Sequence, residues 1–542
     1  MQHVKIFDTT LRDGQQCPGA GMTFAQNIEY AQLAAKIKVD ILEAGFPSAS
    51  QQDFKIVHAI ASMYAHNQTA PQVAALSQLR TDQVEKTIQA LEPLIPSNRG
   101  RLHVYLPVSP ALMTASLGTH ANNKTLLLNE TAEMIKLGMN AGLEVEFSPE
   151  GYSRMGENFD FVTDLISAAI EAGASVINCP DTIGGACYLQ KQNYFVAHMK
   201  IHAQLMKNLY PQRDICWSVH CHNDYGLALD NSMRAVFDGP ATQIEGCFNG
   251  VGERAGNVAL EQCLMYIKNF GNAENGGKKY YTQAQHPVIR EISDFVDKHM
   301  LQRQPHWPIS GSNAAKHSSG GHTNAILKNT QAYQPFDPSE VGQGISFVFG
   351  PLSGSNHAQA IIHKQGYVCE PHERHTITQW IKEYSSDRRK GLTDEEFMKA
   401  YYAYRQPIKV AHFEYTHTTD QNVFKMQCHI FDEEQEIVVH GHSDKTALTA
   451  LHHSLEQRFQ PFSIESYRSE SKERGRDAIS YATISIAYNN HFYSGKGYDQ
   501  NIEISALKAL IDAVNQALID SYYSQQQSSE NQASKAVAQE GS

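Results

Sequence analysis

The first half of the chain alternates short apolar runs with longer segments in which apolar residues recur at helical spacing. Segments 24–37, 82–91 and 158–172 carry apolar side chains at every third or fourth position, a pattern typical of amphipathic helices. Strand-like runs alternate with such segments, at residues 4–7, 40–44, 72–75, 102–106, 143–147, 175–178, 215–220 and 243–247. The alternation predicts parallel strands connected by helices, and therefore an α/β fold.

The number of these units favours a (β/α)8 TIM barrel over residues 1–270, because such a barrel needs about 250 residues. A doubly wound open sheet is the competing fold. The positions of polar residues support the barrel, since the C-terminal ends of barrel strands converge on one face, where loops build the active site. The residues at or just past predicted strand ends are Arg12, Asp13, Glu150, Thr182, His222 and Asn257.

The pattern changes after the predicted barrel. Residues 271–394 contain stretches rich in Gly, Ser, His and Asn with intervening helical segments, and they are predicted to form a helical linker subdomain. Residues 395–523 contain an internal repeat, in which 441–451 aligns with 497–507. Each copy follows alternating strand-like segments and opens an amphipathic helix. The two copies are predicted to pack together as one α+β module.

The end of the chain differs from all of these parts. Residues 524–542 are rich in Gln, Ser and Ala and contain almost no large apolar side chain. Such a composition cannot bury enough apolar surface to offset the entropy of ordering the chain. We therefore predict a disordered tail.

Composition narrows the classes of protein that fit. Hydrophobic residues make up 41% and charged residues 19% of the 542 positions, as in a globular protein. The net charge of −12 argues against nucleic acid or an anionic membrane as a partner. We find neither a bilayer-spanning apolar run nor an N-terminal leader pattern. Nine cysteines without a Cys-x-x-Cys pair are typical of reduced thiols, so we expect a cytoplasmic protein.

Two motifs predict a metal site. Thr10-Leu11-Arg12-Asp13-Gly14 follows the first predicted strand and places a cation beside a carboxylate. His220-Cys221-His222-Asn223-Asp224 closes a later strand, and because strand side chains alternate, both imidazoles point to one side. One Asp and two His form a set of divalent-metal ligands that leaves room for substrate oxygens. The alternative is a structural or exposed His pair.

Three motifs in this order resemble the 2-isopropylmalate synthase group of metal-dependent acyl-CoA Claisen condensation enzymes. They are residues 7–16 (FDTTLRDGQQ), residues 220–224 (HCHND) and residues 249–257 (NGVGERAGN). The resemblance covers roughly residues 1–520. It implies condensation of acetyl-CoA with a 2-oxo acid on a divalent metal ion.

The resemblance assigns the metal ligands and a cation beside them. Asp13, His220 and His222 are expected to bind Mg²⁺ or Mn²⁺, with Zn²⁺ also compatible. Asn257 is a fourth ligand by resemblance, and its alternative role is a helix N-cap. Arg12, next to Asp13, is expected to stabilise negative charge on the former keto oxygen.

Substrate contacts are also implied by the resemblance. Gln16 and Thr182 match positions that hydrogen-bond the substrate carboxylate, although both residue types are common in turns. Glu146, Ser148 and Glu150 face one way along the fifth strand. Homocitrate synthases carry Arg where Glu146 stands, and a carboxylate there would repel a dicarboxylic oxo acid. The resemblance therefore points to 2-oxoisovalerate, with Glu150 orienting a water or the enolised acetyl group.

The remaining expected site residues lie in the linker and in a glycine-rich loop. His322 and Tyr333 match lid residues that deprotonate the acetyl group, although Thr323-Asn324-Ala325 replaces the usual Gln-Asp-Gly after the His. Leu112 stands where many relatives carry His. A phosphate cradle for coenzyme A is expected at Gly250, Gly252 and Arg254, and close helix packing explains the glycines equally well.

The expected activity is thus the first step of leucine biosynthesis, converting acetyl-CoA and 2-oxoisovalerate to 2-isopropylmalate and CoA. The C-terminal module resembles the domain that binds leucine and couples two subunits, so we expect feedback inhibition of a homodimer. Three alternatives stay open: a citramalate synthase that uses pyruvate, a lyase of the same superfamily, and a catalytically inactive amino-acid sensor.

Overall fold

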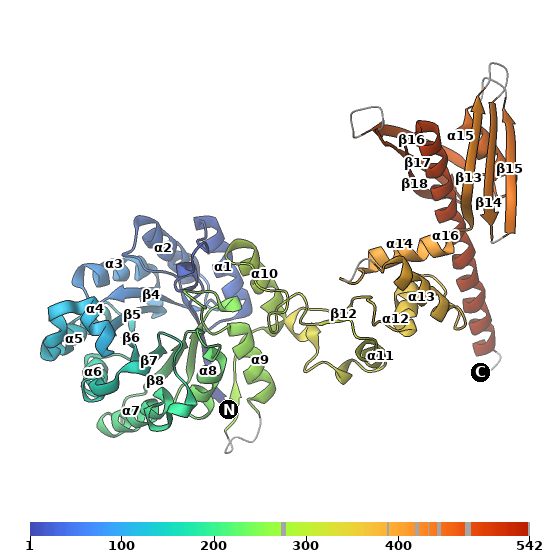
Figure 1. Cartoon of the computed structure of the whole chain (residues 1–542). Helices are drawn as coiled ribbons and strands as arrows, with labels where there is room; N and C mark the ends of the chain where they lie inside the picture. Colours follow the sequence, from blue (N-terminus) through green and yellow to red (C-terminus); the bar gives the residue numbers. More distant parts are fainter. Residues whose placement is uncertain are drawn as a thin grey trace. The chain divides into compact units, whose positions relative to one another are not determined.

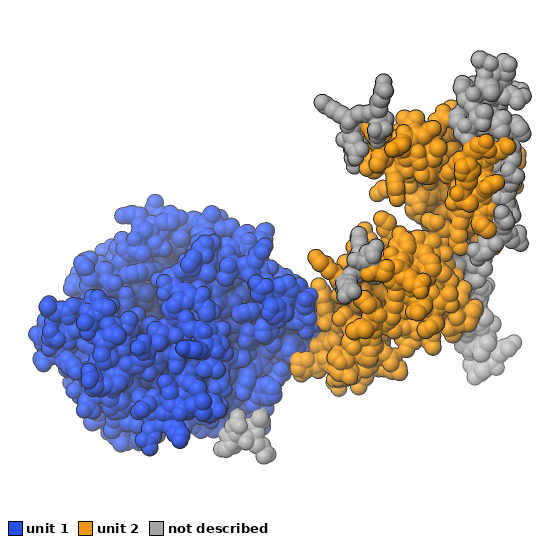
Figure 2. Space-filling model, viewed as in Figure 1, with its two compact units in different colours: residues 1–315, 336–345 blue, residues 316–335, 346–542 orange. Residues whose placement is uncertain are grey.

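The computed structural model describes residues 1–272, 278–386, 390–417, 422–431, 433–441, 446–471 and 478–539. The chain forms two compact units (Figure 2). Unit 1 comprises Met1–Ala315 with Phe336–Ile345, and unit 2 comprises Lys316–Pro335 with Ser346–Ser542.

Unit 1 is built on a closed barrel of parallel strands. The ring closes where β2 pairs with β9, with Ile6 opposite Ile244. The strands are β2 Lys5–Asp8, β3 Ile41–Glu43, β4 Gln72–Gln78, β5 Gly100–Pro107, β6 Glu144–Glu150, β7 Val176–Asp181, β8 Cys216–Cys221 and β9 Gln243–Gly246. Closure confirms the predicted TIM barrel and excludes the open sheet. Below the barrel, a short strand β1 Gln2–His3 pairs with β10 Tyr280–Tyr281.

Helices alternate with the barrel strands along the chain and surround them (Figure 1). They are α1 Phe24–Ile37, α2 Gln51–Ala65, α3 Thr81–Leu91, α4 Pro110–Leu117, α5 Lys124–Asn140, α6 Phe159–Ala172, α7 Phe195–Leu209, α8 Ala228–Phe237, α9 Leu260–Phe270 and α10 Ile289–His299. Capping residues mark where these helices begin and end. Thr23 forms a capping box at the start of α1, and Gly173 adopts φ +117° after α6.

The barrel interior is unusually polar near its N-terminal end. Arg101 has no solvent exposure, and its guanidinium is held by carboxylates and amides from three other strands. Its Nη1 donates to Glu146 Oε2 at 3.0 Å and to Gln243 Oε1 at 2.9 Å, while Nε donates to Glu144 Oε2 at 2.8 Å. Buried polar groups must be paired in this way to avoid a large desolvation cost. The paired layer closes one end of the barrel.

Unit 2 contains a helical part followed by two βββα copies. The helices α11 Gly320–Lys328, α12 Ser355–Lys364, α13 Arg374–Tyr384 and α14 Asp394–Arg405 come first, with short strands β11 Lys316–His317 and β12 Ser346–Phe347. The copies are β13 Ile408–His417, β14 Asn422–Ile430, β15 Glu433–Gly441 and α15 Ala447–Glu456, then β16 Ser463–Ser471, β17 Ser480–Tyr488, β18 His491–Asp499 and α16 Ile502–Gln539.

The two copies share one hydrophobic core. Leu451 of α15 and Leu510 of α16 lie in the same buried cluster as Ile484 of β17. This agrees with the expectation that the copies pack together. The strand-like segments recognisable in the sequence, 424–430, 436–440, 482–488 and 491–494, fall in β14, β15, β17 and β18, whereas the first strand of each sheet, β13 and β16, was not predicted. Part of the aligned repeat, at 442–445, lies outside the described residues.

The end of the chain differs from the expected disordered tail. Helix α16 continues through the Gln, Ser and Ala-rich residues as far as Gln539. These residues include no Pro or Gly before that point, and Ala, Gln, Glu and Lys have good helix propensity, so a helix nucleated by its packed first half can propagate. Separately, no helix within the described ranges is both long and apolar enough to cross a membrane.

Candidate metal centre

The loop after β2 brings a carboxylate and a guanidinium together. Arg12 Nη1 donates to Asp13 Oδ2 at 2.6 Å, and Arg12 Nε donates to Glu43 Oε2, also at 2.6 Å. Burial alone would lower the pKa of Arg12, but the charges of Glu43 and Asp13 outweigh it and hold this pKa above its ordinary value. Arg12 is therefore a fixed cation shared by two carboxylates.

Strand β8 and the residue just past its end supply two imidazoles to the same place. His220 Nε2 lies 3.3 Å from His222 Nε2 and 3.8 Å from Asp13 Oδ2. One ligand atom from each of these residues lies within 4.8 Å of the other two, and all three residues are buried. The structure thus brings together the Asp and the two His that the motifs indicated.

Asn257 joins this group through a loop that precedes α9. Its Nδ2 donates to Asp13 Oδ1 at 2.6 Å and to the Val251 carbonyl at 3.1 Å. Its Oδ1 is buried without a hydrogen-bond partner, and so is Nδ1 of His222. Orphaned acceptors are rare in folded proteins, because an unpaired buried polar atom costs free energy. A bound cation would satisfy the Asn257 oxygen.

The electrostatics of the group suit a divalent metal. Burial would raise the pKa of Asp13, but Arg12 and the two imidazoles lower it below its usual range. Burial lowers the pKa of His220, and burial with the neighbouring His220 lowers that of His222 to about 4. Near neutral pH the set is one carboxylate and two neutral imidazoles, the forms that bind metals. The residues present therefore fit a divalent ion.

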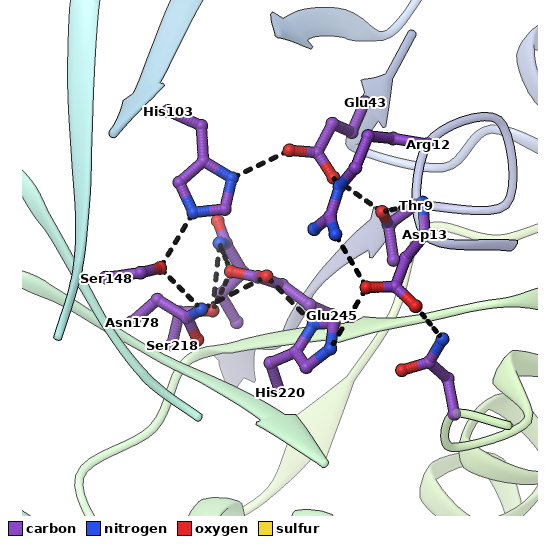
Figure 3. Close-up of polar contacts among 12 residues, drawn as sticks. Thr9, Arg12, Asp13, Glu43, His103, Ser148, Asn178, Ser218, His220 and Glu245 are labelled. Atoms are coloured by element: carbon purple, nitrogen blue, oxygen red, sulfur yellow. Dashed lines mark hydrogen bonds and ion pairs between the residues drawn. The ribbon is translucent and has the colours of Figure 1, made fainter. Parts of the chain in front are cut away.

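A ring of buried hydrogen bonds adjoins the centre (Figure 3). Glu43 Oε1 pairs with His103 Nδ1 at 2.7 Å, and His103 Nε2 pairs with Ser148 Oγ at 2.7 Å. Asn178 Nδ2 donates to Ser148 Oγ at 2.9 Å and to Glu245 Oε2 at 3.2 Å.

Glu245 completes the ring by pairing with a metal-ligand candidate, His220. Glu245 Oε2 lies 3.2 Å from His220 Nδ1. The ring therefore runs from Arg12 to His220, and it fixes which imidazole nitrogen faces Asp13.

The structure revises the interpretation of Glu146. This residue lies one side-chain layer below Ser148 and about 13 Å along the strand from Glu150. Its oxygens accept hydrogen bonds from Arg101 and Gln243. Burial, and to a smaller extent the negative charge of Glu245, raise the pKa of Glu146 well above its ordinary value. Glu146 is thus a buried, paired carboxyl group rather than a free charge, and its expected role in repelling dicarboxylates stays a prediction.

The other expected substrate contacts lie closer to the barrel mouth. Ser148 belongs to the buried ring, and Glu150 ends β6, where burial raises its pKa. Thr182 Oγ1, just past β7, accepts a hydrogen bond from the Gly151 backbone N–H at 2.9 Å. Gln16 is exposed in the short helix after Asp13. Their substrate roles stay predictions.

The glycine-rich loop has a tight geometry. A Cβ on Gly252 would lie 2.3 Å from Asn257 Nδ2, and one on Gly250 would lie 3.0 Å from the Asn257 carbonyl. Arg254 donates to both carboxylate oxygens of Asp224 and to the Thr182 carbonyl. Close packing explains the glycines, and Arg254 is already paired, so a phosphate cradle stays a prediction.

His322 and Tyr333, the residues expected to form the base, belong to unit 2. Their rings stack, with centroids 3.9 Å apart and planes at 19°. Both side chains are exposed. The structure thus brings the two residues together, and their catalytic role stays a prediction.

The sequence interpretation missed four members of the buried ring, namely Glu43, His103, Asn178 and Glu245. Each is a polar residue inside a strand, at an inward position between apolar neighbours. A polar residue at such a position is a detectable signal, because it must find partners inside the barrel. The identity of those partners requires the closed barrel.

Three family models match successive parts of the chain. The model described as HMGL-like matches residues 3–296, the one described as homocitrate synthase post-HMGL domain-like matches 309–390, and the LeuA allosteric (dimerisation) domain matches 393–518.

Similar proteins are named 2-isopropylmalate synthase. That of Heliobacterium modesticaldum is 30% identical over 96% of this chain and 98% of its own length. That of Aquifex aeolicus is 32% identical, over 96% and 97% respectively. Among solved structures, the HMG-CoA lyase of Bacillus subtilis aligns with 56% of this chain and 96% of its own, at 16% identity and a TM-score of 0.45.

Proposed function

Because the chain belongs to the 2-isopropylmalate synthase family of Claisen condensation enzymes, we propose that it condenses acetyl-CoA with 2-oxoisovalerate. The products are 2-isopropylmalate and CoA, in the first step of leucine biosynthesis. One observation carries the proposal: the buried triad Asp13, His220 and His222 lies beside Arg12 and the unpartnered oxygen of Asn257.

The metal is part of the proposal. Asp13, His220, His222 and Asn257 would hold a divalent ion, which supplies Lewis-acid polarisation of the 2-oxo acid when bound. Oxygen and nitrogen ligands without thiolate favour Mg²⁺ or Mn²⁺, and Zn²⁺ is also compatible.

Arg12 contributes a positive charge at the point where negative charge develops. Condensation turns the keto carbonyl into an alkoxide, and a fixed guanidinium in a water-poor site stabilises such charge strongly. Glu43 holds the guanidinium through Nε while Nη1 faces Asp13, so its orientation is set before substrate binds. Thr182 and Gln16 are proposed to bind the substrate carboxylate. The Thr182 oxygen accepts from Gly151, so its own hydroxyl hydrogen can donate.

The stacked pair His322 and Tyr333 is proposed to remove a proton from the acetyl methyl group. The resulting carbon nucleophile bonds to the keto carbon, and the new alkoxide takes up a proton. Water then cleaves the thioester to release CoA and the free dicarboxylic acid. Glu150, whose pKa is raised by burial, is proposed to orient the water or the enolised acetyl group.

The charges inside the barrel favour an oxo acid with an uncharged side chain. Arg101 is fully buried in the barrel and Arg12 is partly buried in the loop after β2, and both guanidinium groups are already paired. Arg12 is bonded to Asp13 and Glu43, and Arg101 is bonded to Glu144 and Glu146. A second substrate carboxylate would therefore be buried without a free cation, which is costly.

The C-terminal module is proposed to bind leucine and to couple two subunits. This rests on the match of residues 393–518 to the LeuA allosteric (dimerisation) domain. A cytoplasmic location is also proposed, in keeping with the nine free cysteines.

A free-thiol assay with a panel of oxo acids tests the proposal. Purified protein is incubated with acetyl-CoA, Mg²⁺ or Mn²⁺ and either 2-oxoisovalerate, pyruvate or 2-oxoglutarate. We expect the highest kcat/KM for 2-oxoisovalerate, and loss of CoA release after chelation with recovery on metal addition. A preference for pyruvate would identify citramalate synthesis instead. Absence of oxo-acid-dependent CoA release would favour an amino-acid sensor.

A further inference from the structure

Helix α9 connects the candidate metal loop, residues 249–257, to the chain that follows the barrel. Glu261 in its first turn has no solvent exposure. Its Oε2 accepts a hydrogen bond from the Asn249 backbone N–H at 3.0 Å, and its Oε1 accepts one from Trp307 Nε1 at 2.8 Å. One buried carboxyl group thus bridges the start of the metal loop and a tryptophan far along the chain.

Two further hydrogen bonds hold Asn249 at the start of the metal loop, one from Ser310 near Trp307 and one to Ser293 in α10. Ser310 Oγ donates to Asn249 Oδ1 at 3.3 Å, and Asn249 Nδ2 donates to the Ser293 carbonyl at 2.8 Å. The Trp307 ring packs closely over Gly250, since a Cβ there would lie 3.3 Å from Trp307 Cζ2. Asn249 has φ +57°, in the left-handed region, so these contacts hold a strained backbone position.

The metal loop is tightly packed between Asn249 and the candidate metal ligands. Gly252 packs so closely on Asn257 that a Cβ would lie 2.3 Å from its Nδ2. Asn257 in turn donates to Asp13 at 2.6 Å. A shift at Asn249 would therefore be passed to Asn257 rather than absorbed by the loop.

The same helix also holds the chain where it returns to unit 1. The segment Lys316–Pro335 belongs to unit 2, and Phe336–Ile345 returns to unit 1. There Glu340 Oε2 pairs with Lys268 Nζ of α9 at 2.5 Å, and Gln343 Nε2 donates to the Ile309 carbonyl at 2.9 Å. Both flanks of the segment that carries His322 and Tyr333 are thus fastened at α9.

We propose that Trp307 is a positioning residue that fixes the metal loop, through its hydrogen bond to Glu261 and its ring on Gly250. The same contact sets where the chain leaves the barrel for the segment with His322 and Tyr333, a consequence that rests on the proposed function. Helix α9 thus contacts the start of the metal loop and the first flank of this segment through Glu261, and the second flank through Lys268.

Replacing Trp307 with Phe tests the proposal, because it removes both parts of the contact: the Nε1–H donor to Glu261 and the outer indole ring whose Cζ2 lies over Gly250. Metal affinity is measured by calorimetric titration of the metal-free protein with Mn²⁺, which needs no substrate. We expect Kd to rise by about 10-fold, the lower end of the range for residues behind metal ligands. The KM for the oxo acid rises and kcat falls. The matched control is W380F, at a ring that packs on Tyr384 and Tyr404 of unit 2.

A double-mutant cycle isolates the hydrogen bond. W307F, E261Q and the double variant are compared. Because Gln keeps one acceptor oxygen, E261Q cannot accept from both Asn249 N–H and Trp307 Nε1–H, and we expect the effects of the two changes on the Kd for Mn²⁺ to be less than additive, since both act on one hydrogen-bond network. S310A is a second, milder variant for the case in which W307F does not fold. It removes the hydrogen bond from Ser310 Oγ to Asn249 Oδ1 and keeps the Trp307 ring, and it is expected to weaken Mn²⁺ binding severalfold. Wild-type Mn²⁺ affinity in folded W307F and S310A would overturn the proposal. If the variants bind Mn²⁺ more weakly but the wild-type protein turns over no oxo acid, the positioning role of Trp307 is supported and the proposed function is refuted.

Discussion

At the scale of single residues, the candidate centre depends on charges that are shared. Arg12 lies between Asp13 and Glu43, and Glu43 also pairs with His103. Burial opposes ionisation of Glu43, yet Arg12 and His103 lower its pKa to about 2. The result is a buried, ionised group that holds the guanidinium in one orientation. Only the planar guanidinium of arginine can hold both carboxylates in this way, because a different nitrogen faces each of them.

Replacing Arg12 with Lys should therefore impair catalysis more than folding. A lysine keeps the charge but offers a single ammonium group, which cannot serve Glu43 and Asp13 with the same geometry. We expect kcat to fall about 10²- to 10³-fold, the loss typical of one donor to a developing oxyanion. Steady-state CoA release measures it, and R234K, at a half-exposed pair on α8, is the matched control. A kcat within threefold of wild type would contradict the role of Arg12.

At the scale of elements, the glycine-rich loop before α9 is as important as the strands. It carries Asn257 to Asp13, and its close packing leaves no space for side chains at Gly252. Strand β8 brings His220 and His222 to the same point from the other side, and an isolated bridge pairs His222 with Asn257. The site is thus assembled where one loop folds back on one strand end.

The substitution G252A tests this view of the loop. The new methyl group would overlap the Asn257 amide and approach Asp13 Oδ1 at 3.2 Å, so the loop must move. We expect at least a 10-fold rise in the Kd for Mn²⁺ and a destabilisation of about 1–3 kcal/mol, as for other overpacked sites. Calorimetric titration and thermal unfolding measure the two effects. In the control G21A the methyl group would meet no atom within 4 Å, so equal losses in both variants would refute the explanation.

At the scale of the whole molecule, catalytic and C-terminal parts have separate cores. The barrel cluster includes Phe147 and Leu165, whereas the C-terminal cluster combines both βββα copies, with Leu451 and Leu510 in one core. A module that buries two copies against each other can change stability or arrangement when a ligand binds, without unfolding the barrel. The match of residues 393–518 to the LeuA allosteric (dimerisation) domain supports the proposed regulatory role of this module.

Leucine is therefore expected to inhibit the enzyme without competing with acetyl-CoA at the barrel. Initial rates of CoA release are measured with increasing leucine, and valine and alanine serve as controls of similar chemistry. We expect saturable inhibition by leucine and a much weaker response to the other two. An unchanged rate at high leucine, in protein whose condensation activity is established, would remove the regulatory assignment and leave the catalytic one intact.

Much of the architecture could be predicted because its causes are local. Alternating strand and helix patterns reflect the periodicity with which each element buries one face, so the barrel strands were found with errors only at their ends. Strands β13 and β16 were missed. The residues of β16, SIESYRSES, are mostly polar and exposed, so they carry no periodic apolar signal.

The grouping of Asp13, His220 and His222 was also predictable from short motifs. His220 in β8 and His222 just past its end point to one side by strand alternation, and Asp13 follows the end of β2.

Only the tertiary structure decided how the centre is supported. Glu43, His103 and Glu245 come from β3, β5 and β9, and they meet because the barrel closes and stacks inward side chains in layers. The same layering places Glu146 in the buried pair with Arg101. The sequence by itself determined the helices and strands and the types of candidate metal ligand. The partners of the buried polar groups depended on contacts between distant strands, which no local pattern encodes.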